Sequence, residues 1–251
     1  MANIVESLEL RQPTVVTNRL LAEVAAETGS RLGPGAVAER LVRGGWLLPL
    51  RRRGAWEFVP GARAGRFSSG DPWLELRAVL AQDPAAPVAV AFESAVWELG
   101  FSDHQPAAAI LAHRHGWRPP RALDGLRSVT YDWRLAAGDK AGLPLWHPAT
   151  VVVAAAHRPD IQGDWANADD WLPETMRATT PDEVLVEADG RPTATLARLG
   201  YLAEWSGRSD VAEAVAARLR APWGVTFLGP RDRRRRWAKR WRVYDSVLPD
   251  R

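Results

Sequence analysis

The chain has 251 residues, of which 46% are hydrophobic and 25% charged, a globular composition long enough for one large or two modest domains. It contains no Cys, which excludes disulfides, thiolate metal sites and cysteine nucleophiles. The longest apolar runs, such as residues 149–156, are too short to span a bilayer, and residues 1–6 lack the basic leader of an export signal. We therefore expect a cytoplasmic protein with no membrane partner.

The charges are unevenly distributed, although the formal net charge is only +3. Residues 1–66 carry ten Arg and six Glu, and residues 221–251 carry nine basic residues and three Asp. The segment between them has 21 acidic and 14 basic residues. Because clustered arginines displace condensed counterions from a phosphate backbone, the basic ends predict binding to a polyanion. A solvated basic surface is the simpler alternative.

Residues 13–59 have the pattern of two short helices followed by a hairpin. Thr17 is a candidate N-cap for a helix that Gly29 ends, and Pro34 suits the first turn of a second helix that ends at Gly44 and Gly45. Residues 46–59 then alternate apolar positions around a basic turn, 51–54, whose glycine supplies a positive φ. The sequence therefore predicts an N-terminal winged helix-turn-helix.

A winged helix-turn-helix binds DNA by placing its second helix in the major groove, while the wing reaches phosphates or the minor groove. Glu39 either reads cytosine or forms an ion pair with Arg43 at i, i+4 spacing. A winged helix that docks another protein, with solvated arginines, is the alternative. The predicted DNA-binding residues of this domain are Ser30, Arg31, Arg40, Arg43, Arg51, Arg52 and Arg53.

The Gly-, Ser- and Arg-rich segment 61–72 reads as a linker, which predicts one domain over residues 1–66 and a second over residues 67–251. The second domain is expected to mix α and β structure, so the fold class is α+β. The expected elements are helices from Pro72, over 88–99, 182–187, 193–205 and 210–219 with Ser209 as N-cap of the last, and strands over 107–112 and 128–135.

Two groups of residues have the chemistry of a metal site, but neither has metal-ligand spacing. His113 and His115 would share one face of a strand and could join His104, His147 or Asp132, although solvated or hydrogen-bonded histidines are favoured. The chain has no motif for nucleotide binding or hydrolysis, so we expect no catalytic residues, no metal and no cofactor. The second group is acidic and comprises Asp160, Asp164, Asp169, Asp170 and Glu174. These carboxylates could hold Mg²⁺, but they flank loops and expected helix starts, where an acidic residue interacts favourably with the helix dipole, so capping is the favoured role.

The C-terminal segment interleaves basic residues with Trp237 and Trp241. Basic groups beside aromatic rings suit nucleic acid, by phosphate contact or by stacking on unpaired bases. A second DNA contact and a loop positioned by folding are both open, while Trp241 alternates with Val243 as a core residue of a strand would. The predicted DNA-binding residues here are Arg233, Arg234, Arg235 and Arg236.

Several segments resemble the AbiEi-type antitoxins, whose systems are type IV toxin-antitoxin systems. The winged helix from Thr17 through the LVRGGWLL run at 41–48 to Pro60 resembles that family's N-terminal domain. Residues 91–100, 197–202 and 228–231 resemble its C-terminal domain. The resemblance also favours a helix over the ambiguous run 149–156. The 13 Trp depart from the pattern, and many lie outside the matching segments.

The resemblance implies a transcriptional autorepressor that binds inverted repeats of its own promoter. It also implies a C-terminal domain that counters a nucleotidyltransferase-like toxin without a stable complex. The alternative from the acidic middle is a metal-dependent nuclease using Asp169 and Asp170. A winged helix for protein docking is the third possibility.

Overall fold

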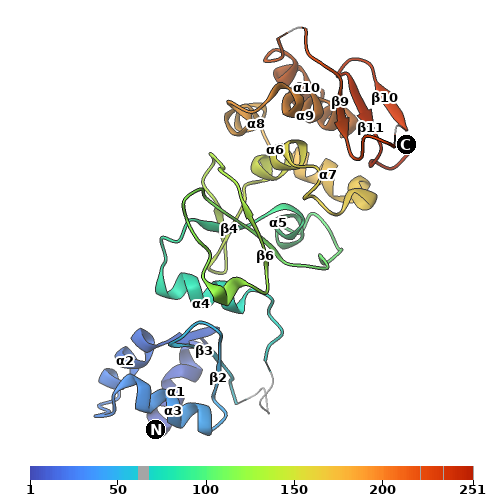
Figure 1. Cartoon of the computed structure of the whole chain (residues 1–251). Coiled ribbons are helices and arrows are strands. Elements are labelled where there is room, and N and C mark those ends of the chain that lie inside the picture. The colour runs from blue at the N-terminus through green and yellow to red at the C-terminus, as the bar shows by residue number, and fades with distance from the viewer. Residues whose placement is uncertain (62–67, 221, 234, 251) are drawn as a thin grey trace. The chain divides into compact units, whose positions relative to one another are not determined.

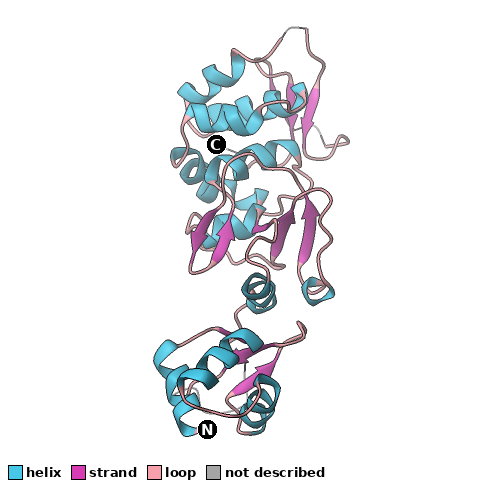
Figure 2. Ribbon diagram, turned by 90° about the vertical axis from the view of Figure 1, so that its left-hand side faces the viewer, coloured by secondary structure: helices cyan, strands magenta, loops and turns pink. Residues whose placement is uncertain are grey.

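The computed structural model describes residues 1–61, 68–220, 222–233 and 235–250. The chain forms two compact units: residues 1–87 with 118–126, and residues 88–117 with 127–251. Figure 1 follows the chain through its elements, and Figure 2 shows that both units contain helices and strands. The fold is therefore α+β, as predicted, and each unit is described by itself.

The first unit begins as a winged helix-turn-helix. Its order is α1 (Ala2–Arg11), β1 (Val15–Thr17), α2 (Asn18–Glu27), α3 (Pro34–Arg43), β2 (Leu47–Pro49) and β3 (Ala55–Phe58). The strands lie in the order β1-β3-β2, all antiparallel. The local signals act as expected: the Thr17 hydroxyl accepts the Leu20 N–H at 3.3 Å, and Gly29 and Gly54 have positive φ.

Helix α1 has no counterpart in the sequence prediction. Its Ile4 and Leu8 are fully buried in one core with Leu21 and Val24 of α2 and Leu41 of α3. Only two positions of α1 are buried, so its apolar pattern is weak. The packing of Ile4 and Leu8 against α2 and α3 therefore stabilises this helix, and its weak amphipathic pattern explains why the sequence did not predict it.

Helix α4 (Leu74–Gln82) and a 3₁₀ turn at Arg121–Leu123 also belong to the first unit. Helix α4 packs on β1 and β3 of the winged helix and on the 3₁₀ turn. The expected boundary at residue 66 falls in segment 62–67, outside the described residues, whereas the compact units divide at Pro87 and Val88.

The second unit contains a five-stranded sheet in the order β6-β5-β4-β8-β7. These strands are β4 (Val88–Val90), β5 (Ile110–His113), β6 (Arg127–Thr130), β7 (Gly138–Lys140) and β8 (Leu143–Leu145).

The predicted helix over 88–99 is wrong in its first part. Residues 88–90 form the buried central strand β4, and only Phe92–Glu98 is helical, as α5. The β-branched Val88 and Val90 suit a strand covered on both faces, where period-2 alternation disappears. Phe92, with φ 51°, makes the sharp turn between strand and helix.

The predicted strand over 128–135 is also too long. Strand β6 ends at Thr130, and the backbone N–H groups of Arg134 and Leu135 donate to the buried Glu187 carboxylate instead of to a neighbouring strand. The predicted strand over 107–112 is shifted, because β5 begins at Ile110.

Helices fill the rest of the second unit: α6 (Pro148–His157), α7 (Ala168–Arg177), α8 (Pro181–Ala188), α9 (Thr193–Trp205) and α10 (Ser209–Ala216). Every residue of 149–156 is buried, which explains the missing periodicity and confirms the helix there. Helix α6 contacts α5, α7, α8 and α9. The predicted N-cap Ser209 is instead the first residue of α10, and the N-cap position is Arg208, which forms an ion pair with Asp210 at 2.8 Å.

A second sheet closes the chain, with β9 (Thr226–Leu228), β11 (Val243–Asp245) and β10 (Arg236–Ala238). Strand β11 pairs in parallel with β9 and antiparallel with β10. Trp241 is buried against α9, where a Cβ at Gly200 would overlap its ring. The prediction that Trp241 belongs to the core is confirmed. Over the described residues, no helix is both long and apolar enough to cross a membrane.

Candidate nucleic-acid interface

Helix α3 has one buried and one exposed face. Val37, Ala38 and Leu41 are buried in the core of the winged helix. Arg40 and Arg43 lie on the exposed side of the same helix. This is the arrangement a groove-reading helix needs, because the core fixes the helix while its basic side chains extend outward.

Glu39 lies on the exposed side of α3 and forms an ion pair with Arg43 at 2.6 Å. The Arg43 side chain is still 73% exposed. An exposed i, i+4 pair contributes only about 0.3–0.5 kcal/mol, so Arg43 can exchange this carboxylate for a phosphate or a base edge at little cost.

The turn before α3 contains Ser30 and Arg31. The Ser30 hydroxyl oxygen accepts the backbone N–H of Leu32 at 3.3 Å, and a serine hydroxyl can also donate a hydrogen bond. Arg31 is exposed. Both residues therefore lie just before the N-terminus of α3, where backbone N–H groups and the helix dipole favour an anion.

The wing tip, residues 50–54, is held by helix α4. The Glu75 carboxylate accepts the backbone N–H groups of Arg51 and Arg52, at 2.8 and 3.3 Å. The Gln82 side-chain amide accepts from the Arg52 guanidinium at 2.7 Å and donates to the Arg53 carbonyl at 3.0 Å. The wing backbone is therefore fixed, Arg52 is directed to α4, and Arg51 and Arg53 are exposed.

The sequence prediction assigned neither Glu75 nor Gln82 a role. They are seven residues apart, so they lie two turns apart on one face of α4. That spacing is a usable signal only once the wing is known to lie against the helix.

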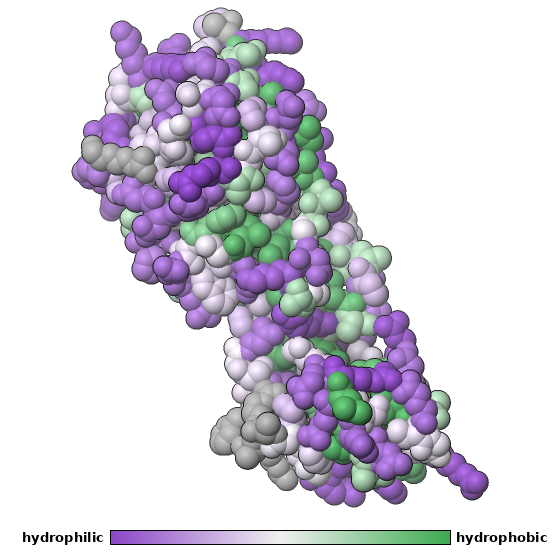
Figure 3. Space-filling view, turned by 180° about the vertical axis from the view of Figure 1, so that it is seen from behind, coloured by the Kyte–Doolittle hydropathy of each residue, from purple (hydrophilic) through white to green (hydrophobic). Residues whose placement is uncertain are grey.

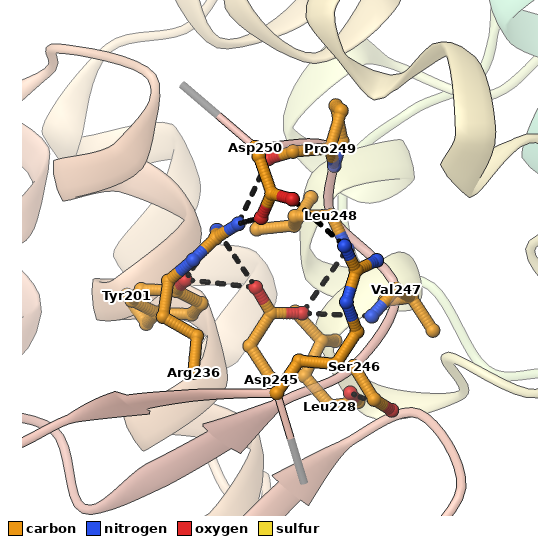
Figure 4. Close-up of polar contacts among 10 residues, drawn as sticks. Tyr201, Leu228, Arg236, Asp245, Ser246, Val247, Leu248, Pro249 and Asp250 are labelled. Carbon is orange, nitrogen blue, oxygen red and sulfur yellow. Dashed lines mark hydrogen bonds and ion pairs between the residues drawn. The ribbon is translucent and has the colours of Figure 1, made fainter. Parts of the chain in front are cut away.

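The C-terminal arginines fall into two groups. Arg233 is exposed, and Arg235 is exposed with an ion pair to Asp250 at 2.8 Å. Arg236 instead donates to the Asp245 carboxylate at 3.0 Å, to the Pro249 carbonyl at 3.0 Å and to Asp250 at 2.8 Å, as Figure 4 shows. Its contacts favour a structural role. Arg234 lies outside the described residues.

Asp245 is the centre of this network and is only 1% exposed. Besides Arg236 it accepts from the Tyr201 hydroxyl at 3.0 Å and from the backbone N–H groups of Val247 and Leu248 at 2.9 and 3.1 Å (Figure 4). Burial, partly offset by Arg236, raises the pKa of Tyr201 to about 12, so its hydroxyl remains a donor at neutral pH. The network ties the chain end to α9.

The histidine and acidic groups have local partners. His113 is buried, with Nδ1 3.1 Å from the Arg114 carbonyl and Nε2 3.4 Å from the Thr130 hydroxyl. Asp169 and Asp170 lie in the first turn of α7, as the capping interpretation expects. Within the described ranges, no three His, Asp or Glu side chains gather where they could hold a metal ion.

The remaining acidic residues are also placed locally. Asp160 pairs with Arg158 at 3.2 Å, Glu174 pairs with Arg177, and Asp164 accepts from the Asn167 amide at 2.7 Å. A hydrogen bond from the Arg158 side chain lowers the pKa of Asp160, so this carboxylate is held ionised by its neighbour.

The fold defines an α+β protein whose N-terminal elements follow the order and pairing of a winged helix-turn-helix and are followed by a larger C-terminal part. Residues 88–205 match the family model of the AbiEi antitoxin C-terminal domain. The match confirms the resemblance of residues 91–100 and 197–202 to that family's C-terminal domain, and it supports an antitoxin role in a toxin-antitoxin system.

One solved structure is similar over almost the whole chain. It is the crystal structure of the RV2827C protein from Mycobacterium tuberculosis, with a TM-score of 0.81 and 28% sequence identity. The match covers 98% of this chain and 91% of that one. None of the curated proteins matches the sequence.

Proposed function

We propose that the protein is the antitoxin of a type IV toxin-antitoxin system and represses its own promoter by binding double-stranded DNA. The observation that carries the proposal is α3, with its basic exposed face opposite a fully buried one. In the proposed complex Arg40 and Arg43 enter the major groove of an inverted-repeat half-site. Such a repressor works in the cytoplasm, where we place the protein.

The other N-terminal arginines position the helix on the duplex. Arg31 and Ser30 lie where phosphates approach the start of α3, and Arg51 and Arg53 extend from a wing that α4 keeps fixed. Phosphate contacts of this kind set orientation and register, while sequence is read by base-edge contacts.

Within the proposal, residues 67–251 act as the antitoxin domain. They include the segment 88–205 that matches the AbiEi family, whose antitoxin role this part of the chain is proposed to supply. The partner is a nucleotidyltransferase-like toxin that is countered without a stable complex.

Binding to the promoter tests the DNA-binding half of the proposal. We expect the full chain to prefer duplex covering its own upstream region over a scrambled duplex in fluorescence anisotropy, with affinity that falls as salt rises. Arg40→Ala and Arg43→Ala should each cost about 1–3 kcal/mol on the specific duplex. Arg177→Ala, which removes an exposed ion-paired arginine of the second unit, is the matched control. Unchanged promoter affinity in both α3 variants would overturn the assignment.

Co-expression with the toxin tests the antitoxin half. We expect growth to be rescued by the chain and equally by the double variant Arg40→Ala/Arg43→Ala, because that variant leaves residues 67–251 intact. Size-exclusion chromatography of the mixed proteins should give separate peaks. Loss of rescue in the double variant would tie protection to repression and contradict a separate antitoxin domain.

A further inference from the structure

The C-terminal sheet carries a row of aromatic rings on one face. The strand register places Trp237 of β10 opposite Tyr244 of β11, and Tyr244 beside Phe227 of β9. The ring centroids of Trp237 and Tyr244 are 4.5 Å apart, and those of Tyr244 and Phe227 are 5.8 Å apart in a stacked arrangement. We call these three residues the aromatic face.

The opposite face of the sheet is buried. Thr226, Leu228, Val243 and Asp245 alternate with the aromatic residues and are all buried, and β9 and β11 pack on helix α9. The sheet is therefore anchored by one side, and the aromatic face is its outward side.

The aromatic face reaches the surface at Trp237, while Phe227 and Tyr244 are half-buried. Trp237 is 42% exposed, and Val225, the residue just before β9, is 46% exposed. Large hydrophobic side chains at such exposure are few among the described residues. Hydrophilic residues, by contrast, predominate on the side of the molecule seen in Figure 3. The three rings of the aromatic face are contiguous, and a contiguous apolar patch that reaches the surface marks an interaction site.

The rim of this face is strongly basic. The Arg231 guanidinium lies 5.6 Å from the centre of the Phe227 ring. The segment 231–242, which contains β10 and leads into β11, carries several exposed cationic residues against one exposed Asp, Asp232, and Arg235 among them is paired with Asp250. They include Arg231, Arg233, Arg235, Lys239 and Arg242. Such a rim favours a polyanion over an apolar protein surface.

We propose that the aromatic face binds single-stranded nucleic acid by stacking unpaired bases on Trp237 and its neighbours, with the basic rim on the phosphates. Stacking on a sheet of aromatic residues requires bases that are free of a duplex, because paired bases already stack on each other. The site is therefore different in kind from the duplex-binding helix α3, and neither depends on the other.

Anisotropy titrations with fluorescein-labelled dT12, rU12 and an abasic 12-mer at low and moderate salt test the proposal on the full chain. We expect dT12 or rU12 to bind at least fivefold more tightly than the abasic strand, and the tighter of the two identifies DNA or RNA as the source of the bases. Trp237→Ala should weaken this binding about 5- to 150-fold, whereas Trp237→Phe should retain most of it. Equal affinity for the abasic strand, unchanged affinity in Trp237→Ala, or no binding at low salt would each overturn the proposal.

Two controls separate this site from the rest of the chain. Val186→Ala alters an exposed hydrophobic residue of α8 in the same unit and should leave dT12 binding unchanged. Arg40→Ala/Arg43→Ala should weaken promoter duplex binding but not dT12 binding, and Trp237→Ala should do the reverse. If the double variant loses both ligands equally, the single strand binds at α3 and the aromatic face is not its site.

Discussion

Replacing Arg236 by Ala should destabilise the second unit, although Arg236 belongs to a run of basic residues that suggested DNA contact. The change removes the cationic partner of Asp245, a carboxylate that is 1% exposed. Breaking a buried ion pair costs about 3–5 kcal/mol when the remaining charge is left uncompensated. Here the loss is smaller, because the Tyr201 hydroxyl and two backbone N–H groups still donate to Asp245. The Arg236 side chain is also 32% exposed, so water can enter.

A hydrogen bond to a charged group is worth about 1.5–3 kcal/mol, which puts the expected loss near 2–3 kcal/mol. For a unit of this size that loss corresponds to a fall in Tm of about 4–12 °C. Thermal unfolding followed by circular dichroism measures it, with Arg233→Ala as the matched control for an exposed arginine nearby. At a temperature well below both transitions, Arg236→Ala should bind promoter duplex as the parent does. Equal Tm values for the two variants, or a selective loss of duplex binding in Arg236→Ala, would refute the structural assignment.

Three other changes have defined outcomes. Gly200→Ala improves helix propensity by about 1 kcal/mol but forces a methyl into the rigid Trp241 ring, so urea unfolding should show a net loss of about 1–3 kcal/mol, and a gain would contradict the packing. Glu75→Gln weakens the acceptor of the Arg51 and Arg52 backbone N–H groups. It should lower promoter affinity a few-fold and leave the melting temperature of the winged helix little changed. Unchanged affinity would show that the wing does not need this contact. Burial and neighbouring arginines lower the pKa of His157. As pH falls, the imidazole is therefore protonated near pH 6.5 in the unfolded chain but only at lower pH in the folded chain. The free energy of unfolding should consequently fall as pH drops from 7.5 to 5.5. His157→Gln should flatten that dependence, and an equally steep fall in the variant would assign it to other groups.

The winged helix could be predicted because its signals are local. Thr17, Gly29, Pro34 and Gly54 each determine the backbone within a few residues of themselves, so single positions carry the information. Strand β4 could not be predicted in this way, since a strand buried on both faces has the same apolar run as a buried helix.

The sequence could not distinguish the structural arginine, Arg236, from the exposed arginines for a different reason. Two of the partners of Arg236 are Asp245, nine residues later, and Tyr201, 35 residues earlier. Nothing in the run of basic residues itself marks the one that turns inward. The aromatic face had a partial signal, because Trp237 stood among basic residues, but its neighbours Tyr244 and Phe227 became visible only with the register of the sheet.

Neither compact unit is encoded by one uninterrupted stretch of the gene. The chain passes from the first unit to the second after Pro87, returns for residues 118–126 and leaves again before Arg127. The returning segment packs on α4, the helix whose Glu75 and Gln82 hold the wing. A single recombination point therefore cannot transplant the complete first unit onto another protein. A fusion made at residue 66 would carry α3 without the helix that holds its wing. If the protein binds DNA as proposed, a change of its target sequence therefore calls for replacing side chains on α3 rather than exchanging residues 1–66 as a module.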